Sequence, residues 1–423
     1  MWQPDMPFEN IFLTTIVALI PIIWIFFGML KLHMPSQYAG ITSLVFCAAI
    51  AALVWKMPAK HIIESVIEGI AVALWPIIWV IFTAIFTYNL SIASGSMNII
   101  SRMLSSISED IRVQALIIAF AFGGFLEAAA GFGTAVAIPA SILIALGFQP
   151  MKATIISLAA LVIWAKLFPV KKPLTFNKEI KTFQSNNNPV SFNEGIKAWS
   201  PYIFILVLVL ATRLVPALGF LSKYPFEITL RFYSGAGGKP VSFPLLTSPG
   251  SIIIISAVLG GLLQGVPIKE MLSVAMKTLR QTSNTVLTVT SIVSLAKLMG
   301  YSGMSSVVAS SLSILTGRFF PLISPAMGAL GTFITGSDTS SNVLFGELQK
   351  QTAIRINANA GWITAANATG ATAGKMISPQ SIAIATSSTG LKGYDGKILR
   401  ETIKYALIFV VLLGIIVFGF QYF

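Results

Sequence analysis

The chain has 423 residues, of which 55% are hydrophobic and 10% are charged, and its formal net charge is +13. Soluble domains carry about 25% charged residues, so this composition excludes an ordinary soluble protein and predicts a polytopic helical membrane protein. Basic residues between apolar runs are typical of cytoplasmic loops, and the charge therefore predicts no nucleic-acid binding. A single cysteine allows no internal disulfide, and the sequence predicts neither a metal site nor a cofactor.

The first third of the chain contains several apolar runs. Ile11–Leu32, Gly40–Trp55 and Val66–Leu90 are predicted spans, and Pro76 interrupts the third of them. Ser94–Arg112 places apolar and polar residues at helical spacing, which predicts an amphipathic helix at the membrane interface.

The run from Ala121 to Phe148 is long enough to cross a membrane, yet it holds Glu127 and four glycines in its middle. A carboxylate at membrane depth is costly and survives mainly where it faces a cavity or a partner. Glycines that interrupt a helix free backbone groups that lipid cannot satisfy. We therefore predict two half-helices whose tips line a polar site near Gly131, Gly133 and Thr134. The alternative is a kinked structural helix with one snorkelling glutamate.

We divide the chain into an N-terminal membrane half (1–170), a polar basic loop (171–199) and a C-terminal membrane half (200–423). Lys171–Lys197 holds five lysines and two glutamates, which supports the loop. The predicted elements of the second half are spans at Pro201–Phe220, Ser251–Val266, Gln281–Gly300 and Tyr405–Phe423, a non-helical loop at Leu221–Pro249 and an amphipathic helix at Pro267–Arg280.

Two more polar breaks interrupt apolar segments of the second half. One is Gly336–Asn342 and the other is Asn367–Gln380. The fold class is thus all-α, with roughly 8–11 spans by the ~20-residue length criterion, broken or re-entrant helices and the remains of an inverted repeat.

Broken helices suit a small organic anion, because free N–H groups at half-helix starts carry partial positive charge. Lys375 is the candidate counter-charge. Glu127 and Asp338 are the candidate coupling groups, either as proton carriers or as ligands of Na⁺, with the proton preferred. The other candidate binding residues are Gly131, Gly133, Thr134, Thr335, Ser337, Thr339, Ser340, Asn342, Asn367, Ser378 and Gln380.

Three motifs give the chain a resemblance to the bacterial L-lactate permease family. They are Gly124-Phe-Leu-Glu-Ala-Ala-Ala-Gly-Phe-Gly-Thr134, Thr335-Gly-Ser-Asp-Thr-Ser-Ser-Asn342 and Gly374-Lys-Met-Ile-Ser-Pro-Gln-Ser-Ile-Ala-Ile384. The resemblance covers nearly the whole chain and implies a multi-pass protein of the bacterial plasma membrane. It implies import of L-lactate with a proton, with D-lactate and glycolate as further candidate substrates.

Members of that family are longer, and the missing piece lies between about Ala160 and Trp164. The alternative function is therefore an internally deleted membrane remnant or scaffold that does not transport. An enzyme is not predicted, because both histidines, His33 and His61, lie far in sequence from the hydroxyl-rich breaks. A channel could also use polar breaks, but repeated breaks favour a carrier.

Overall fold

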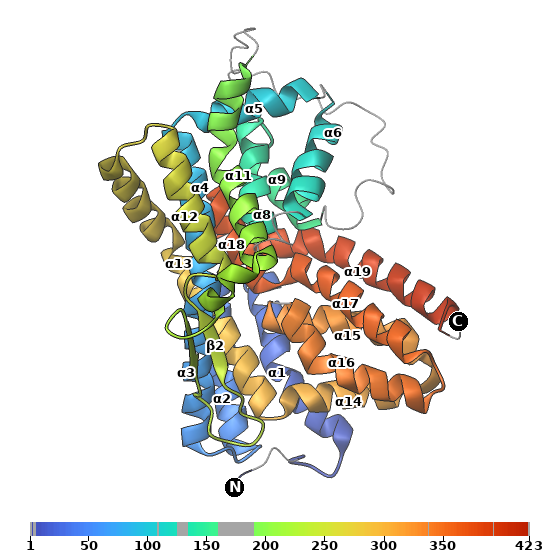
Figure 1. Cartoon of the computed structure of the whole chain (residues 1–423). Coiled ribbons are helices and arrows are strands. Elements are labelled where there is room, and N and C mark those ends of the chain that lie inside the picture. The colour runs from blue at the N-terminus through green and yellow to red at the C-terminus, as the bar shows by residue number, and fades with distance from the viewer. Residues whose placement is uncertain are drawn as a thin grey trace.

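The computed structural model describes residues 2, 6–107, 110–124, 134–159, 190–336, 338–391 and 393–421. Within these ranges the regular secondary structure is helical except for one two-stranded hairpin, which confirms the all-α fold class (Figure 1). Five of the described helices are long and apolar enough to cross a membrane. They are Ile11–Leu30, Ser36–Leu53, Ala59–Ala93, Phe192–Thr212 and Asp395–Gly419.

The first two predicted spans are α1 (Ile11–Leu30) and α2 (Ser36–Leu53). Asn10 caps α1 by accepting from the N–H groups of Phe12 and Leu13. Buried residues of both helices join the largest hydrophobic cluster. Their other faces stay apolar and exposed, which suits contact with lipid.

The third predicted span is interrupted where the sequence indicates. It comprises α3 (Ala59–Val72), the π-helical η1 (Ala73–Ile78) and α4 (Trp79–Ala93). Trp75 has non-helical backbone angles (φ −136°, ψ 120°), because the residue before a proline avoids the helical region. The indole N–H groups of Trp75 and Trp79 donate to Pro244 and Ser251, so both rings have packing partners.

The predicted interfacial helix is α5 (Ser96–Ile107). It is followed by α6 (Ile111–Ala115), η2 (Leu116–Phe122), α8 (Thr134–Ala145) and α9 (Pro150–Ala159). Glu127, Gly131 and Gly133, at the predicted first break, lie outside the described residues.

The predicted polar loop ends earlier than expected. The next helix, α11 (Phe192–Leu214), begins inside the range 171–199, because Ser191 and Glu194 form a capping box. The short η3 (Pro216–Ser222) follows.

The predicted non-helical loop contains a β-hairpin. Its strands are β1 (Glu227–Leu230) and β2 (Val241–Pro244), which pair antiparallel with Glu227 opposite Pro244. The alternating residues of this segment are typical of a strand. After it, α12 (Pro249–Leu263) begins at Ser248, whose hydroxyl accepts from the N–H of Ser251.

One boundary in the second half is wrong. The amphipathic helix expected at Pro267–Arg280 and the span expected at Gln281–Gly300 form a single helix, α13 (Ile268–Tyr301). No glycine or proline separates them, so the helix continues through the change in polarity. Its second part packs on α2 and α3.

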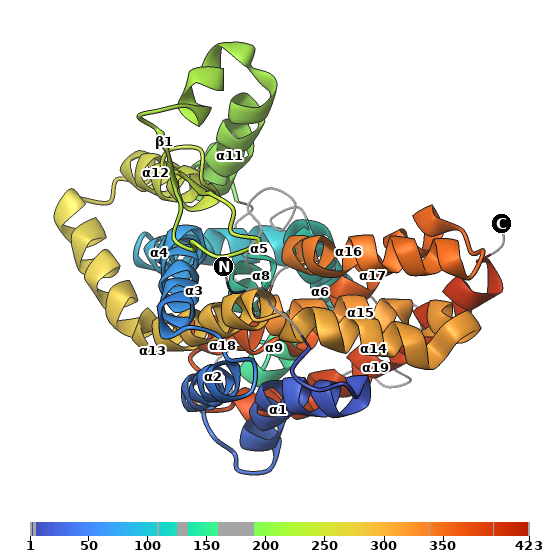
Figure 2. The ribbon, with the colours of Figure 1, turned by 90° about the horizontal axis from the view of Figure 1, so that it is seen from below.

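Most of the remaining helices gather on one side of the molecule, coloured orange to red in Figures 1 and 2, while α18 (Pro379–Thr389) lies near its middle. The others are α14 (Met304–Thr316), the short η4 (Gly317–Phe319), α15 (Phe320–Thr335), α16 (Asp338–Arg355), α17 (Ala360–Ile377) and α19 (Asp395–Gly419). Helices from the two predicted membrane halves pack against one another, as α13 does on α3 and α18 on α8.

Candidate functional site

The second predicted break is the tip of a helical hairpin. Helix α15 ends at Gly336, whose backbone is left-handed (φ 71°), and α16 starts at Asp338. The two helices run antiparallel, since Gly328 and Gly331 lie against Ser341, and Ser324 contacts Gln349. The backbone of this break therefore lies at the end of two helices that pack closely against each other.

The third predicted break lies between α17 and α18. Ser378 has an extended backbone (φ −61°, ψ 127°) and stands before Pro379, the first residue of α18. The hydroxyl of Ser378 and the amide oxygen Oε1 of Gln380 are buried and have no hydrogen-bond partner among the residues that the structure describes. Buried polar groups without a partner are rare in folded proteins, so these two atoms distinguish the third break from the apolar helices around it.

These two breaks meet. A Cβ atom built on Gly336 would lie 1.8 Å from Oε1 of Gln380, so the hairpin tip touches the first turn of α18. The N-terminus of α18 and the hairpin tip thus border one polar point, which sequence spacing alone could not show.

Close helix packing brings the breaks together. On α17, Gly370 and Gly374 lie against the backbone carbonyls of Pro325 and Ala329 on α15. On α15, Gly328 lies equally close to the carbonyl of Asn367. Small residues four apart allow membrane helices to approach to backbone contact, which is what these glycines do.

The predicted residues Asn342 and Asn367 belong to a hydrogen-bond network that connects the helices around the breaks. The amide of Asn367 donates to Oδ1 of Asn342 at 2.6 Å and accepts from Gln349 at 2.7 Å. Gln349 also contacts Ser324, so the chain of bonds joins α15, α16 and α17. Asn342 borders an open groove of about 540 Å³ between α16 and α17.

The predicted charged residues flank the two breaks. Asp338 is the first residue of α16, and its carboxylate accepts from the hydroxyl of Thr332 at 3.4 Å. Lys375 lies in the last turn of α17, three residues before Ser378. Ser337 lies outside the described residues, as do the side chains of Thr134, Thr335, Thr339 and Ser340.

The first predicted half-helix also reaches this region. Val136, near the start of α8, belongs to the same hydrophobic cluster as Phe333 and Ile334, which precede the hairpin tip. Ile382 of α18 belongs to it as well, and Ser141 donates to the carbonyl of Ser388 at 3.5 Å. The described part of the first broken region, helix α8, therefore packs beside α18, the helix that follows the third break.

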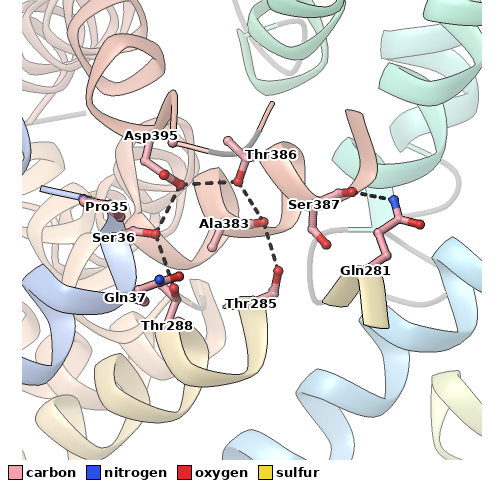
Figure 3. Close-up of a pocket in the computed structure, with 11 residues that line it drawn as sticks. Pro35, Ser36, Gln37, Gln281, Thr285, Thr288, Ala383, Thr386, Ser387 and Asp395 are labelled. Carbon is pink, nitrogen blue, oxygen red and sulfur yellow. Dashed lines mark hydrogen bonds between the residues drawn. The ribbon is translucent and has the colours of Figure 1, made fainter. Parts of the chain in front are cut away.

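A second polar cavity, of about 100 Å³, was not predicted from the sequence (Figure 3). Asp395 is its one charged lining residue, is only 5% exposed, and accepts from Ser36 at 3.1 Å and Thr386 at 3.3 Å. Its carboxylate repels anions, so this cavity is not a place for a substrate carboxylate. The sequence feature that could have indicated this cavity is Asp395, an acidic residue within the basic cluster that precedes the last span.

The family model of the L-lactate permeases matches residues 14–159 and 152–423, which together cover most of the chain. An L-lactate permease of Streptococcus iniae is 34% identical, and the alignment covers 83% of this chain and 93% of that protein. An L-lactate permease of Bacillus subtilis is 30% identical over 97% of this chain and 96% of its own length. A glycolate permease of Escherichia coli is 30% identical over 98% and 97%.

The comparisons also bear on the missing piece. The alignments with the Bacillus subtilis and Escherichia coli proteins extend over 543 and 542 positions, so both contain residues that these 423 residues lack. The two matches to the family model meet at residues 152–159, next to the junction predicted near Ala160. From its matches and its helices, the chain belongs to the L-lactate permease family, whose members are multi-pass transporters of the bacterial plasma membrane and not enzymes.

Proposed function

We propose that this protein imports L-lactate by proton symport across the plasma membrane, with D-lactate and glycolate as further substrates. The family membership and the names of the relatives support a small 2-hydroxy acid as the substrate. The observation that carries the proposal is the meeting of two helix breaks at Gly336 and Gln380, beside polar groups that have no described partner.

The polar groups where the two breaks meet suit both the carboxylate and the 2-hydroxyl group of lactate. The N-terminus of α18 offers N–H groups with partial positive charge, and the Ser378 hydroxyl can donate a further hydrogen bond to a carboxylate. Oε1 of Gln380 is an acceptor that suits the 2-hydroxyl group. Lys375, in the last turn of α17, supplies the positive charge of the region.

Proton coupling needs a group that changes charge during the transport cycle. Glu127 and Asp338 remain our candidates, and Asp338 begins α16 immediately after the break. The same carboxylates could ligate Na⁺ beside exposed carbonyls. The uptake experiment described below therefore includes a Na⁺ gradient.

The alternative is a membrane remnant that folds without transporting. The residues that the longer relatives contain and this chain lacks support it, because alternating access commonly moves one structural repeat against another.

The test is uptake of labelled L-lactate into proteoliposomes, with no gradient, with an inward proton gradient and with an inward Na⁺ gradient. We expect accumulation with the proton gradient alone. Accumulation driven by Na⁺ would overturn proton symport. Absence of uptake by folded, correctly inserted protein would favour the remnant.

A further inference from the structure

A fully buried carboxylate lies in α3, far from the two breaks in sequence. Glu68 is 0% exposed and is part of the helix Ala59–Ala93, which is long and apolar enough to cross a membrane. An ionisable group inside such a helix is costly unless it is paired, and groups of this kind commonly carry ions or protons. The function proposed above makes no use of Glu68.

The two oxygens of this carboxylate differ. Oε1 accepts from Nζ of Lys297 at 2.7 Å and from the hydroxyl of Tyr301 at 2.7 Å. Oε2 is buried and has no hydrogen-bond partner within the described ranges. Oε1 thus has two hydrogen-bond donors from α13, while Oε2 has a lone pair that no described donor uses.

A backbone contact between α3 and α13 fixes the position of the Glu68–Lys297 pair. A Cβ atom on Gly69 would lie 2.3 Å from Cα of Ser294, so α3 and α13 touch next to Glu68. Ser294 donates to the carbonyl of Val66 at 3.2 Å. A change in the Glu68–Lys297 pair would therefore act directly on the interface of these two helices.

Among the described residues, the titratable groups around Glu68 belong to three elements, which are α13, the segment after β1 and α3 itself. The ammonium of Lys297 and the phenol of Tyr301 come from α13, and Tyr233, with Arg231 bonded to its carbonyl, comes from the segment after β1. The ring of Tyr233 stacks on that of Tyr301 at 3.8 Å.

On α3 itself, His61 and Glu64 lie one to two turns before Glu68 and bond to each other at 3.1 Å. Glu64 also accepts from Ser234. Helix α2 contributes only Tyr38 and Cys47 as titratable residues, and η1 contributes none. Among the described residues, the ammonium of Lys297 is the positive charge that contacts Glu68 directly, and the side chain of Lys297 is 32% exposed.

We propose that Glu68 is a further group that binds the coupled proton during the transport cycle, in addition to the candidates Glu127 and Asp338, with Lys297 and Tyr301 stabilising its carboxylate in the empty state. This inference rests on the proposed proton symport. The proton adds to Oε2 and neutralises the carboxylate, so the positive charge of Lys297 is no longer balanced. The protein then holds one more positive charge, which favours an incoming anion. Release of both the proton and the anion restores the salt bridge.

The test compares two transport modes in proteoliposomes. Glu68→Gln keeps the shape of the side chain but cannot change charge. We expect accumulation driven by a proton gradient to fall about tenfold or more, equal to ~1.4 kcal/mol of lost coupling. Exchange of labelled for unlabelled lactate without a gradient should stay within about twofold of wild type.

The matched control is Glu401→Gln, a partly exposed glutamate paired with Lys404 at 2.9 Å, which should change neither mode. Wild-type activity tests the proposed function separately. Unchanged accumulation in Glu68→Gln would overturn the role of Glu68. Loss of exchange together with accumulation, in protein with the wild-type unfolding temperature, would also overturn it.

A readout without transport keeps the inference testable if the wild type proves inactive. Infrared difference spectra between neutral and acidic pH should show one component of the protonated-carboxyl band that Glu68→Gln lacks and Glu401→Gln retains. An identical band in wild type and Glu68→Gln would overturn the proposal. Because Glu68→Gln leaves Lys297 without its partner, the double variant Glu68→Gln/Lys297→Gln, which removes both charges, serves as the second variant.

Discussion

At Gly336 a side chain meets two separate obstacles. The residue ends α15 in the left-handed region (φ 71°), and a Cβ atom would lie 1.8 Å from Oε1 of Gln380. Gly390 ends α18 with the same φ of 71°, but a Cβ atom there would meet nothing within 4 Å. The two glycines therefore share the conformational requirement, and only Gly336 has the steric one.

We predict that Gly336→Ala abolishes lactate uptake, because the added methyl group displaces Gln380 from the meeting point of the two breaks. Gly390→Ala should retain most of the uptake and cost about 1–2 kcal/mol in stability, the strain of a left-handed alanine. Uptake and thermal unfolding of both variants check this. Equal loss of uptake in the two variants would mean that only the backbone conformation matters.

A second prediction concerns Glu127. Glu127→Gln should abolish proton-driven uptake and leave membrane insertion intact, because the amide cannot change charge at membrane depth. Labelled L-lactate accumulation and the yield of folded protein are the measurements. Unchanged accumulation in this variant would remove Glu127 from the coupling mechanism.

The sequence could indicate some of these residues and not others. The breaks at Gly336 and Ser378 were predictable because glycine, proline and hydroxyl residues interrupted apolar runs. Glu68 and Asp395 were not recognised, because each stood near basic or polar residues at the edge of an apolar run. The burial of Glu68 depends on α13, and that of Asp395 depends on α2 and α13, which come from distant parts of the chain.

At the scale of elements, the glycines of α17 set the distance to α15. A Cβ atom on Gly374 would lie 2.2 Å from the carbonyl oxygen of Ala329, whereas one on Gly300, in the last turn of α13, would meet nothing within 4 Å. Close backbone contact thus stabilises the pair of helices that carries both breaks.

We predict that Gly374→Ala destabilises the protein by about 1–3 kcal/mol and reduces uptake, because the methyl group forces α15 and α17 apart. Gly300→Ala should be neutral or slightly stabilising, since alanine favours a helix. Thermal unfolding in detergent and lactate uptake are the measurements. An unfolding temperature for Gly374→Ala equal to that of Gly300→Ala would contradict the packing argument.

Spans that were uniformly apolar were predictable to within a few residues, as α1 and α2 show. The continuity of α13 was not, because its polar first part resembles a separate surface helix while its backbone has no interruption. The hairpin of β1 and β2 was visible only as an alternating stretch. Its pairing needed the return strand after a stretch rich in glycine.

At the scale of the whole molecule, the chain lacks a segment that the longer relatives contain. The described helices beside the three breaks still pack into one core, since Val136 of α8, Phe333 of α15 and Ile382 of α18 share one hydrophobic cluster. Extensive packing between the two predicted membrane halves also remains, as between α13 and α3. We propose that a chain with this packing can still bind lactate, and binding can be tested apart from transport.

The most direct measurement is the affinity of the purified protein for L-lactate, by titration calorimetry, in wild type and in Ser378→Ala. We expect wild type to bind, and Ser378→Ala to bind about tenfold more weakly, because a hydrogen bond to a charged group contributes ~1.5–3 kcal/mol. Equal affinity in both proteins, or absence of binding by folded wild type, would contradict a lactate site at the meeting of the two breaks.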